Sequence, residues 1–180
     1  MISLRRVSDP QDAAADGMIA LYQAAFAEPP YLEIHHAADV RRHTWTAFCQ
    51  HCLVVAERRG EVVGFACALR LSEHTDPTIP DFVGSQPDFG GAVDGTVYMA
   101  ELAVASDARG ERLGSRLVDA RLAWARDQGL AHFVMRTDPD RSLSARIYVN
   151  RGAQPLGQLQ DLGSRARSAS RYRRFFWGAV

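Results

Sequence analysis

The sequence predicts a single α/β domain built around a mixed sheet. Its 180 residues are long enough for one sizeable core, and its 47% hydrophobic and 23% charged fractions are typical of a globular protein. Apolar, β-branched-rich runs alternate with segments whose apolar residues recur at helical spacing. These segments follow the order β-α-α-β-β-β-α-β-α-β-β without an internal repeat, so we expect one domain over residues 1–180.

The first segments are predicted as a strand, a helix, a loop and a second helix. Residues 2–7 form a short apolar strand, and Asp9-Pro10 marks a break at which a helix can start. Helical spacing then covers 11–26. The two prolines in 28–31 force an extended loop, because each proline fixes its own φ and restricts the residue before it. We expect a second helix over 37–50.

A hairpin and an acidic segment come next. Two β-branched-rich runs, 53–57 and 62–71, are separated by a short polar turn that contains Gly60, which is typical of a hairpin. Residues 72–95 are rich in proline and glycine and carry five acidic residues but no arginine. A solvated, mobile insertion is the simplest interpretation of this segment, and a lid that faces the substrate is the functional alternative.

The second half of the chain is predicted as alternating strands and helices. The expected strands are 96–105, 132–137, 153–160 and 170–177, and the expected helices are 112–128 and 142–150. From Ser164 onward the chain has five arginines and no acidic residue. A basic face there could meet phosphates or nucleic acid, but a solvated face is the better interpretation.

Composition excludes several classes of partner. Basic and acidic residues number 21 each, so bulk charge predicts neither a nucleic-acid nor a membrane partner. Every one of the 21 basic residues is arginine, a bias that indicates a GC-rich, bacterial genome such as that of an actinobacterium. No apolar run reaches the roughly 18 residues of a membrane span, and the N-terminus lacks the apolar core of a signal peptide.

Cysteine usage is consistent with a cytoplasmic protein without a metal. The three cysteines are an odd number, which argues against a disulfide framework. Cys49 and Cys52 form a CxxC, but no second pair at zinc spacing accompanies it, although His43 and His51 lie nearby. We interpret these thiols as core or half-buried side chains and expect no metal.

The most informative stretch is a strand that leads through a glycine-containing turn into an amphipathic helix. Residues 97–104 form the apolar strand, and Arg109-Gly110-Glu111-Arg112-Leu113-Gly114-Ser115 forms the turn and helix start. Such a junction directs unpaired backbone N–H groups and the positive end of a helix dipole at an anion such as a phosphate. A P-loop is excluded because the chain contains no lysine, and no dinucleotide fingerprint is present.

This stretch resembles the pyrophosphate-binding motif of the GNAT (GCN5-related N-acetyltransferase) superfamily, Arg/Gln-x-x-Gly-x-Gly/Ala. One position departs, because Arg112 replaces the middle glycine. Arginine has an allowed helical φ in a first turn, so we expect weakened or reshaped binding at most. The resemblance implies a mostly antiparallel sheet flanked by helices, and acetyl-CoA as co-substrate. It also implies that backbone amides of 109–115 hold the pyrophosphate and that Leu102, Ala103 and Val104 hold the pantetheine arm.

A second motif supports the same family. Residues 142–153 resemble the segment Asn-x-x-Ala-x-x-Leu-Tyr-x-x-x-Gly-Phe, in which Tyr148 and Gly152 match. Arg141, Ser144 and Ala153 replace the asparagine, the alanine and the phenylalanine of the pattern. A buried structural tyrosine is the alternative for Tyr148, but the two motifs lie in the right order. The resemblance therefore implies that Tyr148 is the general acid that protonates the CoA thiolate.

The resemblance also implies direct attack of an uncharged amine on the thioester, which requires a base. Glu101 is the best candidate, directly or through water, because a carboxylate in an apolar strand is costly to bury unless it is used. In a regular strand, Glu101 would lie on the opposite face from Tyr98 and Leu102. A β-bulge would change which face each of these side chains occupies. Tyr98 is the rival base. We expect Pro30, Tyr31 and Tyr98 to contact the acceptor.

The function predicted from the sequence is N-acetylation of a primary amine on a small molecule or a peptide. Nearby acidic residues weakly favour a cationic amine. An acyl-CoA-binding sensor without turnover stays open as an alternative, because Arg112, Arg141 and Ala153 depart from the family pattern. A structural protein without a ligand is a third possibility. The sequence leaves open whether the protein is a monomer or a homodimer.

Overall fold

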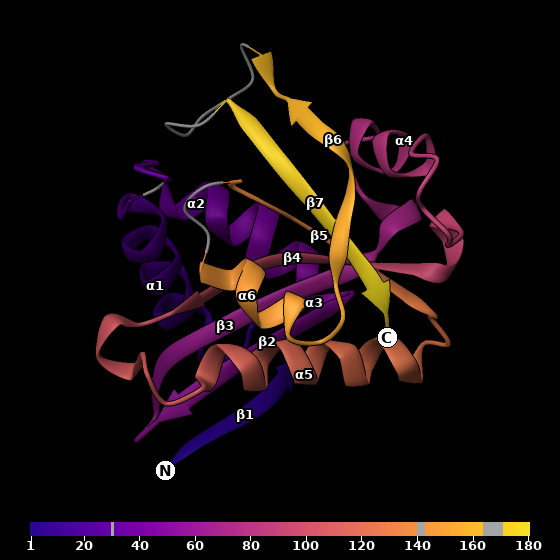
Figure 1. Cartoon of the computed structure of the whole chain (residues 1–180). Coiled ribbons are helices and arrows are strands. Elements are labelled where there is room, and N and C mark those ends of the chain that lie inside the picture. The colour runs from indigo at the N-terminus through magenta and orange to yellow at the C-terminus, as the bar shows by residue number, and fades with distance from the viewer. Residues whose placement is uncertain (30, 140–142, 164–170) are drawn as a thin grey trace.

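A computed structural model of the protein describes residues 1–29, 31–139, 143–163 and 171–180. These residues form one seven-stranded sheet with the strand order β1-β2-β3-β4-β5-β7-β6 (Figure 1). Neighbouring strands are antiparallel except for the β4 and β5 pair, which is parallel. The predicted mixed, mostly antiparallel sheet in one α/β domain is confirmed.

The strands are β1 (Ile2–Val7), β2 (Cys52–Arg58), β3 (Glu61–Arg70), β4 (Thr96–Val104), β5 (His132–Thr137), β6 (Gln154–Asp161) and β7 (Tyr172–Ala179). The helices are α1 (Ala15–Ala27), α2 (Ala37–Val40), α3 (Ala47–Cys49), α4 (Thr78–Gly84), α5 (Leu113–Asp127) and α6 (Leu143–Val149). A π-helical turn, Arg41–Thr46, joins α2 to α3, and short 3₁₀ turns occupy Leu71–Glu73, Val93–Gly95 and Ser106–Ala108. The predicted order of strands and helices is therefore confirmed, with α4 as an addition.

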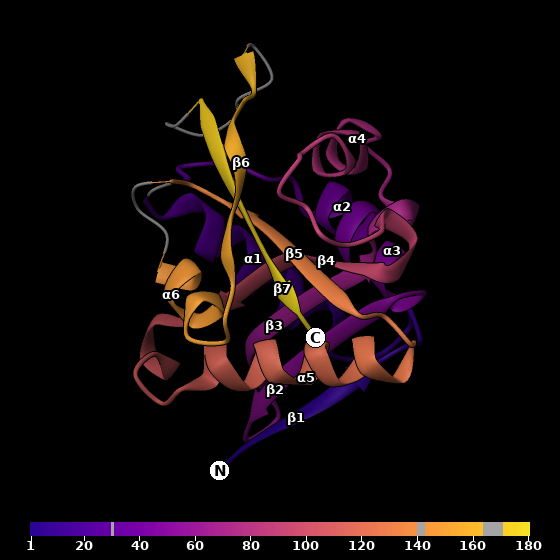
Figure 2. The same cartoon turned by 45° about the vertical axis from the view of Figure 1, so that its right-hand side comes forward.

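The middle of the sheet is buried on both faces. Helices α5 and α6 lie on one face and α1 to α3 on the other (Figures 1 and 2). Strand β2 shows how this follows from alternation, because Cys52, Val54 and Ala56 pack with the α5 face whereas Leu53 and Val55 pack with the α1 face. All five side chains are at most 4% exposed. A strand covered on both faces is expected to read as a continuous apolar run, as β2 does.

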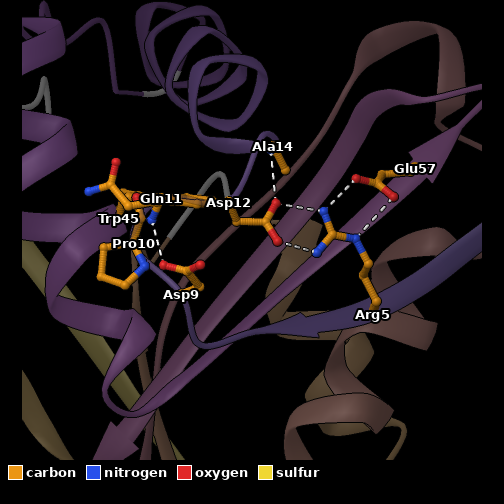
Figure 3. Close-up of polar contacts among 8 residues, drawn as sticks. All are labelled: Arg5, Asp9, Pro10, Gln11, Asp12, Ala14, Trp45 and Glu57. Carbon is orange, nitrogen blue, oxygen red and sulfur yellow. Dashed lines mark hydrogen bonds and ion pairs between the residues drawn. The ribbon is translucent and has the colours of Figure 1, made fainter.

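The start of α1 differs from the prediction. The helix begins at Ala15 rather than Gln11, because Asp12 closes a turn before it. The Asp12 carboxylate accepts the Ala14 N–H at 2.9 Å and two hydrogen bonds from the Arg5 guanidinium at 2.7 and 2.8 Å (Figure 3). Arg5 also donates to Glu57, so β1, β2 and the turn before α1 are joined. This arrangement lowers the pKa of Asp12 to about 2.

The second predicted helix is continuous but not uniform. Residues 37–49 are helical, with the wider π-helical turn in the middle. That turn places Thr44 and the fully buried Trp45 in the core. The Trp45 indole donates to the Pro10 carbonyl at 2.9 Å, which ties this helix to the turn before α1 (Figure 3).

The acidic segment 72–95 is anchored to the sheet, although many of its residues are exposed as the prediction of a solvated segment expects. Helix α4 buries Ile79 and Val83 against Tyr98 and Phe175 of the sheet. Helix α4 lies on the face of the sheet opposite α5, over β4, β5 and β7 (Figure 2). The sequence analysis did not identify α4, because its apolar stripe is short and acidic residues surround it. The arginine-rich stretch from Ser164 onward lies outside the described residues up to residue 170.

Neither a membrane span nor a metal cluster is found in the described part of the chain. None of its helices combines the length and hydropathy needed to cross a bilayer. It also holds no group of three or more His, Cys, Asp or Glu suited to a metal ion. Cys49, Cys52 and Cys67 are buried free thiols, and burial raises the pKa of Cys52 to about 11, so this thiol stays protonated at neutral pH.

Candidate active site

Strand β4 carries a bulge at the centre of the candidate site. Met99 pairs with Ala68 of β3 and Leu102 pairs with Ala66, so β4 has one more residue than β3 between these two pairs. Leu102 therefore joins Met99 on the α5 face. Pairing of β4 with β5 ends at Met99, so the two parallel strands part at this point. The bulge that would reset the side-chain order is present, and Glu101 lies in it.

The first of two pockets beside this point has a volume of about 830 Å³. One wall is the end of β4, formed by Leu102, Ala103 and Val104, and a second wall is the start of α5. The other walls come from α1 and the residues after it, and from α6. The lining residues outside β4 are Ala25, Phe26, Glu28, Pro29, Tyr31, Ala108, Arg109, Gly110, Arg112, Leu113, Gly114, Ser115, Ser144, Arg146 and Ile147.

The start of α5 presents backbone donors to this pocket. The hydrogen bond from the Arg116 N–H to the Arg112 carbonyl is the first of the helix, so the N–H groups of Leu113, Gly114 and Ser115 precede it. All three residues line the pocket. An α-helix of 15 residues begins here, and its dipole favours an anion at this end.

Arg112 adopts a conformation that the sequence interpretation did not expect. Its φ is 57° and its ψ is 18°, in the left-handed region, so the expectation of a helical φ at this residue is wrong. The physical reason is that the chain must reverse before α5, and a left-handed residue at the N-cap makes that reversal. For a residue with a Cβ this conformation costs about 1–2 kcal/mol, which explains why the motif that the chain resembles has glycine here.

Arginines surround the mouth of the first pocket. Arg109, Arg112 and Arg146 are exposed and line it. Arg109 donates to the Glu28 carboxylate at 2.8 Å, which leaves Arg112 and Arg146 without a carboxylate partner among the described residues. Arg146 on α6 was not predicted as a site residue. Of the predicted cofactor-binding residues, Glu111 alone is absent from the lining, and it lies 3.9 Å from Arg58.

The second pocket is smaller and more polar, with a volume of about 410 Å³. Tyr98, Ala100 and Glu101 of β4 form one side, so Glu101 and Tyr98 face the same space. The remaining lining residues are Tyr22, Phe26, Tyr31, Glu33, His35, Asp76, Arg136, Thr137, Leu162 and Arg173. Phe26 and Tyr31 line both pockets, which therefore adjoin. Pro30, the other loop residue predicted to contact the acceptor, lies outside the described residues.

Charges of both signs meet in the second pocket. Burial raises the pKa of Glu101 above its ordinary value, whereas the nearby Arg136 lowers it and Glu33 raises it. Glu33 itself lies 3.0 Å from His35. Burial also raises the pKa of Tyr98, so this phenol is neutral at ordinary pH and is a poor base.

Tyr148 lies in the core, 2% exposed, beside a fully buried arginine. Arg121 of α5 donates to the Tyr148 hydroxyl at 2.5 Å and to the Cys67 carbonyl at 2.9 Å. Burial raises the pKa of Tyr148, and the Arg121 charge acts against it. Ser144, Arg146 and Ile147 of the same helix line the first pocket, but Tyr148 is not among its lining residues.

Sequence interpretation missed Arg121, Arg136 and Arg146. For Arg121 a signal exists, because it lies four residues after Leu117 on the buried stripe of α5. An arginine on such a stripe needs buried acceptors. Arg136 ends the apolar run of β5 one residue after its pairing with β4 stops, and only the tertiary contact shows that this end faces Glu101.

Comparison with known proteins agrees with this geometry. A family model described as the acetyltransferase (GNAT) family matches residues 18–153. The match covers most of the chain and includes both motifs and the parting of β4 and β5. The chain belongs to the GNAT acetyltransferase family. No curated protein matches its sequence.

Solved structures share the fold over nearly the full length. A ribosomal-protein-alanine N-acetyltransferase from Brucella melitensis is 18% identical with a TM-score of 0.71, covering 99% of each chain. A phosphinothricin acetyltransferase from Sinorhizobium meliloti in complex with acetyl-CoA is 15% identical with a TM-score of 0.70, covering 99% of this chain and 88% of that one. An acetyltransferase from Salmonella typhimurium with acetyl-CoA is 17% identical with a TM-score of 0.72, covering 99% and 94%. At these identities the likeness concerns the fold.

Proposed function

We propose that the chain is an acetyl-CoA-dependent N-acetyltransferase that moves an acetyl group directly to a primary amine of a small molecule or a peptide. The observation that carries this proposal is the junction of the two pockets. Consecutive residues of β4, Glu101 and Leu102, line one pocket each, and Phe26 and Tyr31 line both. A donor in the first pocket and an acceptor in the second would therefore meet at the bulge of β4.

The first pocket fits acetyl-CoA. The free N–H groups at the start of α5, with Arg112 and Arg146, suit a pyrophosphate. The pantetheine arm is an extended amide chain and would pair with the main chain of Leu102 to Val104, where β5 has already parted from β4. An N–H of Leu102 or Val104 would then stabilise the oxyanion that forms when the amine attacks the thioester carbonyl.

The second pocket supplies a base for the amine. Glu101 is a carboxylate whose pKa is raised by burial, which makes it a stronger base than an exposed glutamate. In this proposal Glu101 takes the proton from the ammonium, directly or through water. The free amine then forms the C–N bond, its nitrogen loses the second proton to water, and collapse of the tetrahedral oxyanion breaks the C–S bond.

Tyr148 supplies the proton that the leaving thiolate needs. Its hydroxyl already accepts a hydrogen bond from Arg121, so its own proton is available for donation. The Arg121 charge also stabilises the phenolate that would remain, which opposes the effect of burial. Arg121 is a positioning residue in this proposal, because it acts through Tyr148.

The test is release of CoA thiol from acetyl-CoA with a panel of small amines, amino acids, polyamines and peptide N-termini. The proposal expects amine-dependent thiol release and an acetylated product of matching mass. A CoA-binding sensor without turnover is the second candidate, and the absence of Tyr148 from the pocket lining favours it. Tight CoA binding without thiol release for any amine would support the sensor and overturn the enzyme.

A further inference from the structure

The second pocket holds a carboxylate and a guanidinium that do not pair with each other. Glu101 and Arg136 both line it, on β4 and β5, on either side of the point where these strands part. Among the described residues no ion pair of 4.0 Å or shorter involves either side chain. Opposite charges in one pocket, each without a contact partner of opposite sign, suit a ligand that carries both charges.

The groups that contact Arg136 are neutral, while the carboxylates of Asp76 and Glu101 line the same pocket and act on it from beyond ion-pair distance. Its Nη1 donates to the neutral Gln160 amide oxygen at 3.2 Å, and its guanidinium lies 6.0 Å from the centre of the Phe175 ring. Tyr98 lines the same pocket as Arg136. Arg136 as a residue is half-buried. A partly buried guanidinium whose direct contacts are neutral can bind a carboxylate or another planar oxyanion in bidentate fashion.

We infer that the acceptor is a small amino acid, whose carboxylate binds Arg136 while its ammonium lies against Glu101. This inference rests on the proposed function and names the substrate class of its acceptor site. The cavity of about 410 Å³ lies in the range of small-molecule sites. A peptide N-terminus fits less well. The carboxyl group of its first residue forms a peptide bond, so it carries no negative charge for Arg136 to bind.

The experiment compares acceptors that share an amine and differ in the carboxylate. L-Alanine with ethylamine, L-histidine with histamine and L-phenylalanine with phenethylamine form matched pairs, and each amino acid amide serves as a third member. Binding to the CoA-loaded protein is measured by calorimetry, and kcat/KM is measured by thiol release. At least one pair should show a preference of about tenfold or more for the carboxylate, the size expected of one charge-assisted contact.

Arg136→Gln should reduce that preference to near unity while leaving CoA affinity unchanged, which also shows that the variant is folded. Arg126→Gln is the matched control, because Arg126 is exposed in the last turn of α5 and lines neither pocket. This control should keep the preference of the unaltered protein.

The outcomes separate this inference from the proposed function. Preferential binding of the carboxylate member without acetyl transfer would support the amino-acid site and overturn the enzyme. Transfer with equal efficiency to both members of every pair, or better transfer to a peptide N-terminus, would overturn the amino-acid site and leave the enzyme. Binding of no member of the panel would overturn the amino-acid site as well.

Discussion

Gly114→Asp tests whether the start of α5 binds the CoA pyrophosphate. Gly114 is the second residue of the helix, and its N–H precedes the first intrahelical hydrogen bond. A carboxylate there would occupy the donors that the phosphates need and would repel them. The variant should therefore bind CoA more weakly while the fold is kept.

The expected magnitude follows from the geometry. At about 4–5 Å and an effective dielectric constant of about 20, two unit charges repel by about 3–4 kcal/mol. Gly114 is half-buried, so solvent and salt reduce this to about 1–3 kcal/mol, or roughly 5- to 150-fold in Kd. The new Cβ would lie 3.1 Å from Cδ1 of Ile147, the flexible end of that side chain. A carboxylate in a first turn contributes about 0.3–1 kcal/mol to the helix, so the free energy of unfolding should change little.

Gly114→Asn is the matched control, since it has the same size without the charge. Calorimetry with CoA should give a higher Kd for the Asp variant than for the Asn variant, and the difference should shrink as ionic strength rises. Pantetheine, which lacks the pyrophosphate, should bind both variants alike. Equal Kd values for CoA in the two variants would refute a phosphate site at this helix start.

Four further changes test other parts of the molecule. Tyr148→Phe should lower kcat by about 10²–10⁴-fold without changing the Kd for CoA, and comparable turnover would make Tyr148 a structural residue. In the unaltered enzyme kcat/KM should rise with pH through an acid limb above the ordinary glutamate range, since Glu101 must lose its proton to act. Glu101→Gln should lower the rate and remove or shift that limb, measured with an acceptor whose amine is charged at neutral pH. Arg112→Gly should raise the free energy of unfolding by about 0.5–1 kcal/mol in urea titrations, because relief of the left-handed strain exceeds the entropy that glycine adds to the unfolded chain. A loss of stability would contradict that account. Asp12 has a folded-state pKa of about 2, lowered from 3.8, so its ion pair with Arg5 stabilises the fold above pH 3.8 and this contribution is lost as pH falls through 2. Asp12→Asn should therefore cost about 1 kcal/mol at neutral pH and nothing near pH 2, and a pH-independent difference would argue against the pairing.

Strand and helix order could be predicted because it depends on local patterns. Strands β1 and β5 have the predicted bounds, and the other strands end within a few residues of them. The errors arise where a single side chain or a tertiary contact overrides the local pattern. Asp12 delays the start of α1, and α4 is held by apolar contacts with the sheet that its acidic surroundings concealed.

The run of backbone N–H groups at the start of α5, where we propose that the pyrophosphate binds, also follows from sequence, since these donors are consecutive groups at one helix start. The conformation of Arg112 does not, because a side chain specifies φ only weakly and the path of the chain into α5 decides it. Similarly, Tyr148 could be placed on a helix by its spacing to Gly152. Its partner Arg121 lies on another helix, and only packing brings them within 2.5 Å.

The sequence by itself determined the family, the order of elements and the residues at the start of α5. The tertiary structure alone decided how β4 bulges at Glu101, which side chains share each pocket, and that Arg136 faces Glu101 without pairing with it. The physical reason is that backbone periodicity and helix-end chemistry are properties of neighbouring residues. The charge balance of a pocket, in contrast, is a property of side chains from β4, β5 and the loop after α1, which folding alone brings together.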